Sequence, residues 1–391
     1  MNDSAFAHES SARPAVGALR PSQIREVANA GMGESGVLPF WFGEPDEVTP
    51  AFIRDAAAQS LARGETFYSQ NFGIPELREA LGAYVSRLHQ PTSAGHIAVT
   101  ASGMSALMLT VEALVAPGDR VVVVTPLWPN LVEIPKILSA NVVCVPVTFT
   151  AAGWTLDIGR LLAALTPGTR AVMINSPNNP TGWTISRADQ EVILAHCRRR
   201  GIWIIADDVY ERLVYSGEPC APSFLDIAAP EERVVSTNSF SKSWLMTGWR
   251  LGWIVAPEAL MPDLGKLIEY NTSCSPVFVQ RAGVVAITDG EPTIRHTLER
   301  YAAARDYLVP ALARLSRVEV APPAGAMYAF FRVDGVTDSL AFCKQLVREA
   351  RLGLAPGSAF GPEGEGFVRW CFASSPARLA DGVARLARFL G

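Results

Sequence analysis

Short apolar runs alternate along most of this chain with longer segments in which apolar residues recur at helical spacing. The clearest runs are the four valines at 121–124 and residues 202–205. Unbroken runs of this kind are typical of strands that are covered on both faces. The expected strand and helix pairs are residues 96–100 with 105–114, 120–125 with 131–138, and 171–175 with 187–200. The pattern predicts an α/β fold whose mainly parallel sheet is covered by helices, with ligands at the carboxyl ends of the strands.

The pattern changes in the last quarter of the chain. Residues 291–315 have the spacing of one long helix, and short strands are expected around 327–333 and 367–372. This arrangement is typical of a smaller α+β domain. We therefore expect an N-terminal arm that packs on the small domain, a large domain and a small C-terminal domain, at residues 1–36, 37–288 and 289–391.

Composition narrows the class of protein. The chain has 391 residues, 49% of them hydrophobic and 18% charged, which indicates a folded protein with more than one core. A net charge of −4 gives no basic surface for nucleic acid, and no apolar run is long enough to span a bilayer. The six cysteines show no metal-type spacing, which favours a reducing compartment. We expect a cytoplasmic protein that acts on small molecules and binds no metal, nucleic acid or membrane.

One lysine is a candidate for covalent chemistry. Lys242 lies between two serines, and Arg250 follows eight positions later. A lysine in a dry pocket near cations loses proton affinity and becomes a nucleophile that can form an imine. An arginine nearby can hold a phosphate. The segment therefore indicates a phosphorylated aldehyde cofactor.

Residues 31–36 satisfy the GxGxxG pattern, but their surroundings do not fit a dinucleotide site. They follow a polar helical stretch instead of a strand, and they lead into residues 37–39, where a proline prevents a clean helix start. The five histidines lie in unrelated contexts and do not indicate a histidine-based mechanism. We therefore predict neither a dinucleotide-binding site nor a histidine-based mechanism.

Four segments at expected strand ends offer groups that such a cofactor needs. Residues 100–107 are either an ordinary turn or a helix start whose free amides receive a phosphate. Trp128 is either core or a platform for a planar ring. Asn179, between two prolines, can direct its amide at a ligand oxygen. Of Asp207 and Asp208 only one is expected to face the cofactor, because adjacent strand residues point to opposite faces.

Together these segments resemble the fold-type-I pyridoxal-phosphate enzymes of the class I and II aminotransferase superfamily. The resemblance covers most of the chain and includes further motifs at residues 43–46, 68–78, 325–328 and 367–370. It implies an aminotransferase that moves the amino group of an L-amino acid to a 2-oxo acid by a ping-pong mechanism. It also implies pyridoxal 5'-phosphate as cofactor and a homodimer.

The resemblance assigns catalytic roles to Lys242, Asp207 and Tyr210, and it adds Asn179 as a second donor to the cofactor ring. Lys242 forms the Schiff base with the cofactor and shuttles a proton. Asp207 pairs with the pyridine nitrogen, and Tyr210 and Asn179 donate to the phenolic oxygen of the ring. Further implied contacts to the cofactor come from Gly103, Met104, Trp128, Ser239, Arg250 and, across the subunit interface, Tyr68, and the substrate is bound by Gly43, Asn179 and Arg369.

Two of these assignments carry alternatives. Met104 departs from the pattern, because several relatives have a hydroxyl or a lysine there, so only its backbone amide is expected to reach the phosphate. Arg369 lies in an apolar strand pattern and is expected to grip the substrate carboxylate, the alternative being a structural salt bridge.

The substrate side chain is left open by the sequence. Residues 40–42, Trp128, Trp183 and Trp244 suggest an apolar or aromatic pocket, but aspartate or glutamate as donor is not excluded. A pyridoxal-phosphate-dependent C–S β-lyase is an alternative activity for the same site. A regulator with an aminotransferase-like domain is not favoured, because the arm before Val37 is short and not basic.

Overall fold

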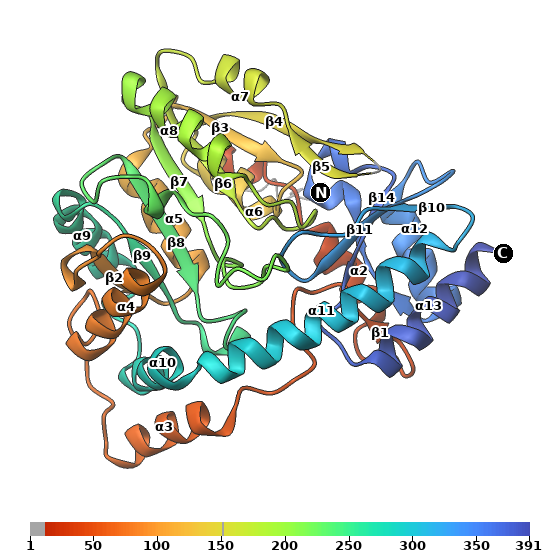
Figure 1. The fold of residues 1–391 in the computed structure, drawn as a ribbon, viewed down its shortest axis with the longest axis horizontal. Helices are drawn as coiled ribbons and strands as arrows, with labels where there is room; N and C mark the ends of the chain where they lie inside the picture. The colour runs from red at the N-terminus through yellow and green to blue at the C-terminus, as the bar shows by residue number, and fades with distance from the viewer. Residues whose placement is uncertain (1–11, 151) are drawn as a thin grey trace, which may run out of the picture.

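A central eight-stranded sheet organises the larger part of the chain (Figure 1). The computed structural model describes residues 12–150 and 152–391. The strand order is β2-β9-β8-β7-β6-β3-β4-β5. Pairs among β3, β4, β6, β7 and β8 are parallel, and β2, β5 and β9 join antiparallel. The bounds are β2 Ile97–Thr100, β3 Arg120–Thr125, β4 Asn141–Thr150, β5 Gly153–Leu156, β6 Thr169–Asn175, β7 Trp203–Asp207, β8 Val234–Ser239 and β9 Gly252–Val255. The predicted mainly parallel sheet is confirmed.

Helices cover both faces of this sheet. Val121 and Val123 pack with α5, α6 and α9, whereas Val122 and Val124 pack toward α7 and α8. A third cluster joins α3, α4 and α10 to β2 and β9. The bounds are α3 Ala51–Ala62, α4 Pro75–Leu88, α5 Gly103–Leu114, α6 Pro129–Ile137, α7 Ile158–Ala164, α8 Arg187–Arg200, α9 Met261–Asn271 and α10 Val277–Asp289. Burial on both faces explains why the strands are unbroken valine and isoleucine runs.

The long helix α11 (Glu291–Ala313) leads to a second, antiparallel sheet of order β10-β11-β14-β13 (Figure 1). Its strands are β10 Val318–Val320, β11 Tyr328–Val333, β13 Ala355–Pro356 and β14 Phe367–Cys371, and its helices are α12 Ser339–Gln345 and α13 Pro376–Leu390. One core cluster joins α11, α13 and this sheet. The predicted smaller α+β unit is therefore present.

Apolar residues between 24 and 38 belong to this second core. Ile24 and Val27 of α2 (Gln23–Gly31) are buried in the same cluster. Strand β1 (Leu38–Pro39) pairs in parallel with β12 (Leu352–Gly353). Residues 37–39 therefore pack with the C-terminal unit, whereas the sequence predicted them in the large domain. The limits of the domains stay predictions.

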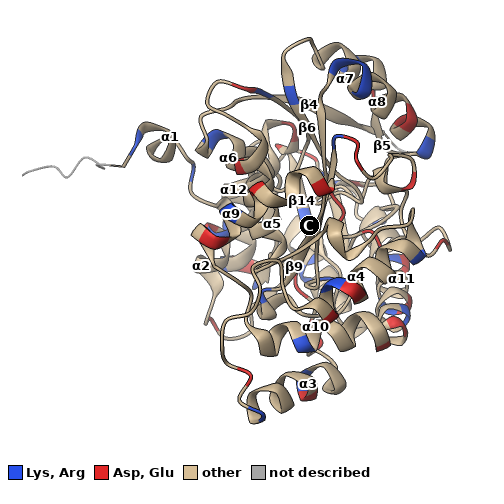
Figure 2. Cartoon of the chain, turned by 90° about the vertical axis from the view of Figure 1, so that its left-hand side faces the viewer, with Lys and Arg blue, Asp and Glu red and all other residues tan. Residues whose placement is uncertain are grey.

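The remaining elements are short. They are α1 Pro14–Gly17, the π-helix η5 Leu346–Ala350 and the 3₁₀ turns η1 Ala94–His96, η2 Phe224–Asp226, η3 Thr247–Trp249, η4 Glu258–Leu260, η6 Gly357–Phe360 and η7 Pro362–Gly364. Positive and negative side chains are interspersed over the helices (Figure 2). Within the described ranges, no helix has both the length and the apolarity needed to cross a membrane.

Candidate active site

The candidate site forms where β6, β7 and β8 end side by side. Asn175 ends β6, Asp207 ends β7 and Ser239 ends β8. Asn175 is in register with Asp207. Gly103 begins α5, the helix that follows β2. The chain turns that follow these strands therefore bring most of the predicted residues to one edge of the sheet.

Lys242 lies at this edge and is partly buried. Its Nζ donates to the backbone oxygen of Gly43 at 2.5 Å. Burial and the nearby charges of Arg369 and Arg250 lower the pKa of Lys242 to about 8, against the opposing effects of Cys371 and Glu44. A substantial neutral fraction near physiological pH makes this amine a competent nucleophile.

Asp207 is a buried carboxyl group, with 5% of its surface exposed. Burial, together with the charge of Asp208, raises the pKa of Asp207 to about 7, although the Val209 amide and the Lys242 charge oppose this. Asn175 Nδ2 donates to the backbone oxygen of Asp207 at 3.0 Å and to the Oδ2 of Asp207 at 3.2 Å. A cationic ring nitrogen would stabilise the charged form of this carboxyl group, so Asp207 fits the expected pyridinium partner.

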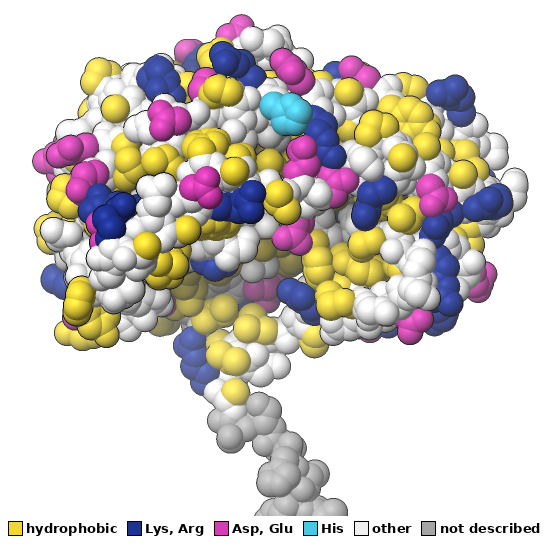
Figure 3. Space-filling model, turned by 90° about the horizontal axis from the view of Figure 1, so that it is seen from below, with side chains coloured by type: hydrophobic (Ala, Val, Ile, Leu, Met, Phe, Trp, Pro, Cys, Tyr) yellow, Lys and Arg dark blue, Asp and Glu magenta, His cyan; other side chains and the backbone are white. Residues whose placement is uncertain are grey.

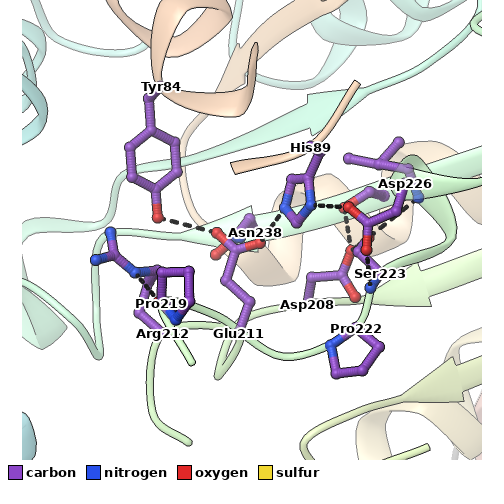
Figure 4. A network of polar contacts seen from close by, with 12 residues as sticks. Tyr84, His89, Asp208, Glu211, Arg212, Pro219, Pro222, Ser223, Asp226 and Asn238 are labelled. Carbon is purple, nitrogen blue, oxygen red and sulfur yellow. Dashed lines mark hydrogen bonds and ion pairs between the residues drawn. The ribbon is translucent and has the colours of Figure 1, made fainter. Parts of the chain in front are cut away.

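The neighbouring Asp208 takes part in a different network (Figure 4). Its Oδ2 accepts from Ser223 Oγ at 3.3 Å. Beyond Ser223 lies the His89 cluster, in which the His89 ring lies between Asp226, 2.6 Å from Nδ1, and Glu211, 3.2 Å from Nε2. The two adjacent aspartates thus face different surroundings, as strand alternation predicts.

Arg369 is buried without an acidic partner. Only 2% of its surface is exposed. Its Nη1 donates to Asn179 Oδ1 at 2.9 Å, and its Nη2 donates to the Trp41 backbone oxygen. Its Nε is buried without a hydrogen-bond partner, and no Asp or Glu in the described ranges forms an ion pair with it. A buried unpaired guanidinium is costly, and an incoming carboxylate would satisfy it. The alternative of a structural salt bridge is therefore not found among the described residues.

Tyr210 and Trp128 border the same space. The Tyr210 hydroxyl lies 2.7 Å from that of Tyr328. Burial raises the pKa of Tyr210 well above its usual value, so the phenol keeps its proton at neutral pH. The Trp128 amide donates to the Asn179 backbone oxygen at 2.9 Å, which ties the start of α6 to the turn after β6. The partly buried Trp128 ring packs beside the central core.

The start of α5 and the end of β8 form a compact cradle. A Cβ added to Gly103 would lie 3.0 Å from Ser239 Cβ, so the two backbones approach closely. Ser239 Oγ lies 2.9 Å from Ser241 Oγ. Ser105 Oγ, in the first turn of α5, is buried without a hydrogen-bond partner. Free amides, hydroxyls and the positive end of a helix fit a phosphate group.

Met104 and Arg250 are two of the predicted phosphate contacts. Met104 Sδ lies 3.5 Å from Asn130 Nδ2, so its side chain is engaged elsewhere and offers no ligand to a phosphate. Arg250 adopts a left-handed φ of 55° and donates from Nη1 to the Thr247 oxygen at 2.9 Å. Its influence on the Lys242 pKa places its charge near that amine.

The structure does not gather every predicted residue. Tyr68 is 90% exposed and contributes little to the buried group within one chain. Trp183 and Trp244, which were expected near a side-chain pocket, are each buried in a core cluster. Asn175 was not predicted as a site residue, although it ends the expected strand at residues 171–175. Within the described ranges no group of three or more His, Cys, Asp or Glu could hold a metal ion.

Solved structures of similar fold define the class of protein. The structure of an aspartate aminotransferase from Rhizobium meliloti has a TM-score of 0.90 at 30% identity, covering 98% of this chain and 99% of that one. An aromatic aminotransferase from Pyrococcus horikoshii has a TM-score of 0.85 at 30% identity, covering 94% and 98%. The fold is that of the pyridoxal-phosphate-dependent aminotransferases.

Sequence relatives give the family. Residues 36–386 match the model of the family "Aminotransferase class I and II", and the chain belongs to that family. It is 33% identical over 376 residues to an aspartate aminotransferase of Pyrococcus horikoshii, covering 95% of each chain. It is 33% identical over 366 residues to an arginine–pyruvate transaminase of Pseudomonas aeruginosa, covering 93% and 92%. The protein is a pyridoxal-phosphate-dependent aminotransferase that acts on amino acids. These relatives give the C–S β-lyase alternative no support.

Proposed function

We propose that this enzyme transfers the amino group of an L-amino acid to a 2-oxo acid by a ping-pong mechanism, with Lys242 as Schiff-base lysine and proton shuttle. Bound pyridoxal 5'-phosphate would supply the aldehyde that takes up the amino group and a ring that accepts electrons when the Cα proton leaves. The observation that carries the proposal is the buried Arg369, which has no acidic partner among the described residues, close to a partly buried lysine whose pKa is lowered to about 8.

The residues of the chain divide the remaining tasks. The Asp207 carboxylate keeps a proton on the ring nitrogen, and Tyr210 and Asn179 donate to the ring oxygen. Trp128 stacks on the ring. The phosphate is held by the amides of Gly103 and Met104, by Ser239, by Arg250 and by Tyr68 of the neighbouring subunit.

Substrate binding rests on Arg369, whose planar fork suits a bidentate contact with the α-carboxylate. Asn179 Oδ1 orients this guanidinium. Gly43 lines the site with its backbone and accepts from the Lys242 amine. Once the amine is free, it is the basic group within reach of the Cα proton. The relatives include aspartate, aromatic-amino-acid and arginine–pyruvate aminotransferases. Amino acids with acidic, aromatic and basic side chains are therefore all to be assayed as donors.

We further propose a cytoplasmic homodimer. Tyr68 and Phe67 are 90% and 84% exposed in the single chain, which suits contact with a second subunit. Hydrophobic side chains also gather in several patches between charges on the face seen in Figure 3. All six cysteines are free, in keeping with a reducing compartment.

The test follows the long-wavelength absorbance of the lysine-linked cofactor in the purified holoenzyme. We expect a subset of L-amino acids to bleach it, with one 2-oxo acid formed per cofactor, and a second 2-oxo acid to restore it. Lys242→Ala should lose this absorbance and the catalysis. Lys266→Ala, which removes an exposed lysine paired with Asp263, is the matched control and should behave as wild type. Ammonia and pyruvate without an acceptor, or wild-type turnover in Lys242→Ala, would contradict the proposal.

A further inference from the structure

Tyr328 contacts three residues to which the proposed function gives roles. It is the first residue of β11 and is fully buried. Its hydroxyl lies 2.7 Å from that of Tyr210, and the Cζ atom of Arg369 lies 4.5 Å from its ring centroid. A Cβ added to Gly43 would lie 2.0 Å from the Tyr328 hydroxyl, so this hydroxyl is packed against the Gly43 backbone. One side chain of the small sheet therefore touches the ring-oxygen donor, the carboxylate clamp and the backbone that receives Lys242.

The hydroxyl pair constrains the direction of one hydrogen. Tyr210 has a single hydroxyl hydrogen, and its proposed role directs that hydrogen to the cofactor ring oxygen. Tyr328 must then donate to Tyr210 Oη. A donor to that oxygen polarises the Tyr210 O–H bond and strengthens its own donation. Burial raises the pKa of both phenols, so both keep their hydrogens at neutral pH.

The ring of Tyr328 acts on Arg369. The guanidinium lies over two aromatic rings, that of Tyr328 and that of Phe360, whose centroid is 5.0 Å from Cζ. A cation over an aromatic face is stabilised most strongly where water is excluded, as here. The rings fix the guanidinium while its Nε is without a hydrogen-bond partner. Loss of the Tyr328 ring would leave a gap on one side of the clamp.

We propose that Tyr328 is a positioning residue for the transamination, with two separable parts. Its hydroxyl sets the hydrogen-bond strength of Tyr210, and its ring holds Arg369 in place for the substrate carboxylate. This inference rests on the proposed function of the site.

The first test removes only the hydroxyl. In Tyr328→Phe holoenzyme, weaker donation by Tyr210 to the ring oxygen destabilises the deprotonated form of the lysine–cofactor link. We expect the apparent pKa from a pH titration of the cofactor absorbance to rise by roughly half to one unit. The KM values for L-aspartate and L-phenylalanine, with 2-oxoglutarate as acceptor, should change by less than about twofold. An unchanged or lowered absorbance pKa would overturn the role of the hydroxyl.

The second test removes the ring. In Tyr328→Leu we expect binding of the substrate carboxylate to be weakened. The KM for L-aspartate or L-phenylalanine, depending on which one the wild-type enzyme accepts, should rise about tenfold, with a smaller change in kcat. A KM equal to wild type would overturn the role of the ring. Tyr301→Phe is the matched control, since Tyr301 is equally buried and its hydroxyl has no hydrogen-bond partner among the described residues. If Tyr328→Leu does not fold, as judged by thermal melting, Tyr328→Met takes its place under the same KM criterion, because a methionine fills much of the space of the ring without an aromatic face.

The two levels of failure are distinguishable. If the wild-type holoenzyme lacked the lysine-linked absorbance, or if Lys242→Ala retained it, the proposed function itself would be wrong. If the absorbance is present and lost in Lys242→Ala, but Tyr328→Phe titrates as wild type, only the inference about Tyr328 fails.

Discussion

Replacing His89 by leucine should destabilise the fold in a pH-dependent way. Only 1% of the His89 side chain is exposed, and its two ring nitrogens face Asp226 and Glu211 (Figure 4). Burial alone would lower the pKa of His89, but hydrogen bonds and charges from Asp226 and Glu211 raise it to about 10. His89 is therefore a buried imidazolium across the neutral range, and leucine would leave two carboxylates without their shared cation.

The magnitude follows from the size of that pKa change. An unfolded histidine titrates near 6.5, so a folded value of about 10 corresponds to roughly 5 kcal/mol of linkage as an upper bound. Breaking a buried ion pair by removing one partner costs about 3–5 kcal/mol. Because the folded pKa of His89 lies above the unfolded one, its contribution is fully present below about pH 6.5 and is lost as the pH rises through about 10.

The contribution of His89 to the free energy of unfolding is measured by urea denaturation of the apo-protein, followed by circular dichroism at several pH values. We expect the difference between wild type and His89→Leu to be about 3–5 kcal/mol near pH 6.5 and to shrink toward pH 10. His196→Gln is the control, since the buried His196 bonds the Leu165 backbone oxygen instead of a carboxylate. Its cost near pH 6.5 should be smaller than that of His89→Leu, because no ion pair is broken. An equal cost of His89→Leu at pH 6.5 and pH 10 would refute the argument.

Three further variants test the site. Arg369→Lys should raise the KM for both amino acid and 2-oxo acid by about ten- to a hundredfold in steady-state kinetics, because the fork is lost; unchanged KM values would exclude Arg369 as the clamp. Asn175→Ala should weaken cofactor binding about tenfold in a spectroscopic titration of the apo-protein, since Asp207 loses its amide donor; equal affinity would show that this contact is dispensable. Tyr68→Phe mixed with Lys242→Ala should recover activity in hybrid dimers, because one of the two sites then has both native residues. No recovery would contradict sharing across the interface.

Much of the fold followed from local pattern. Strand β3 and helix α8 have the bounds that were predicted, because an unbroken valine run and a regular helical stretch carry their own signals. Helix α5 begins two residues earlier than predicted, where the Ser102 hydroxyl caps it by accepting from the Ser105 amide at 3.0 Å. Such capping depends on backbone geometry at the turn and is easily missed in a small-residue segment.

Long-range contacts could not be predicted in the same way. His89 and Asp226 lie 137 positions apart in the sequence, and the residues around each of them do not predict their contact. Trp244 lies two residues from Lys242, but it points into the core with Tyr84 and Trp253, a choice that depends on packing. Proximity in sequence to a motif therefore did not identify the lining of the site.

The two aspartates at the end of β7 make this strand intolerant of insertions and deletions. Asp207 and Asp208 face different surroundings because the strand alternates, so inserting or deleting one residue within β7 would exchange their sides. The proposed pyridinium partner, Asp207, and the contact of Asp208 with Ser223 beside the His89 cluster would be lost together. The exposed turn at residues 216–219, which follows on the same connection, carries no such constraint and is a suitable place for an inserted tag or a lineage-specific extension.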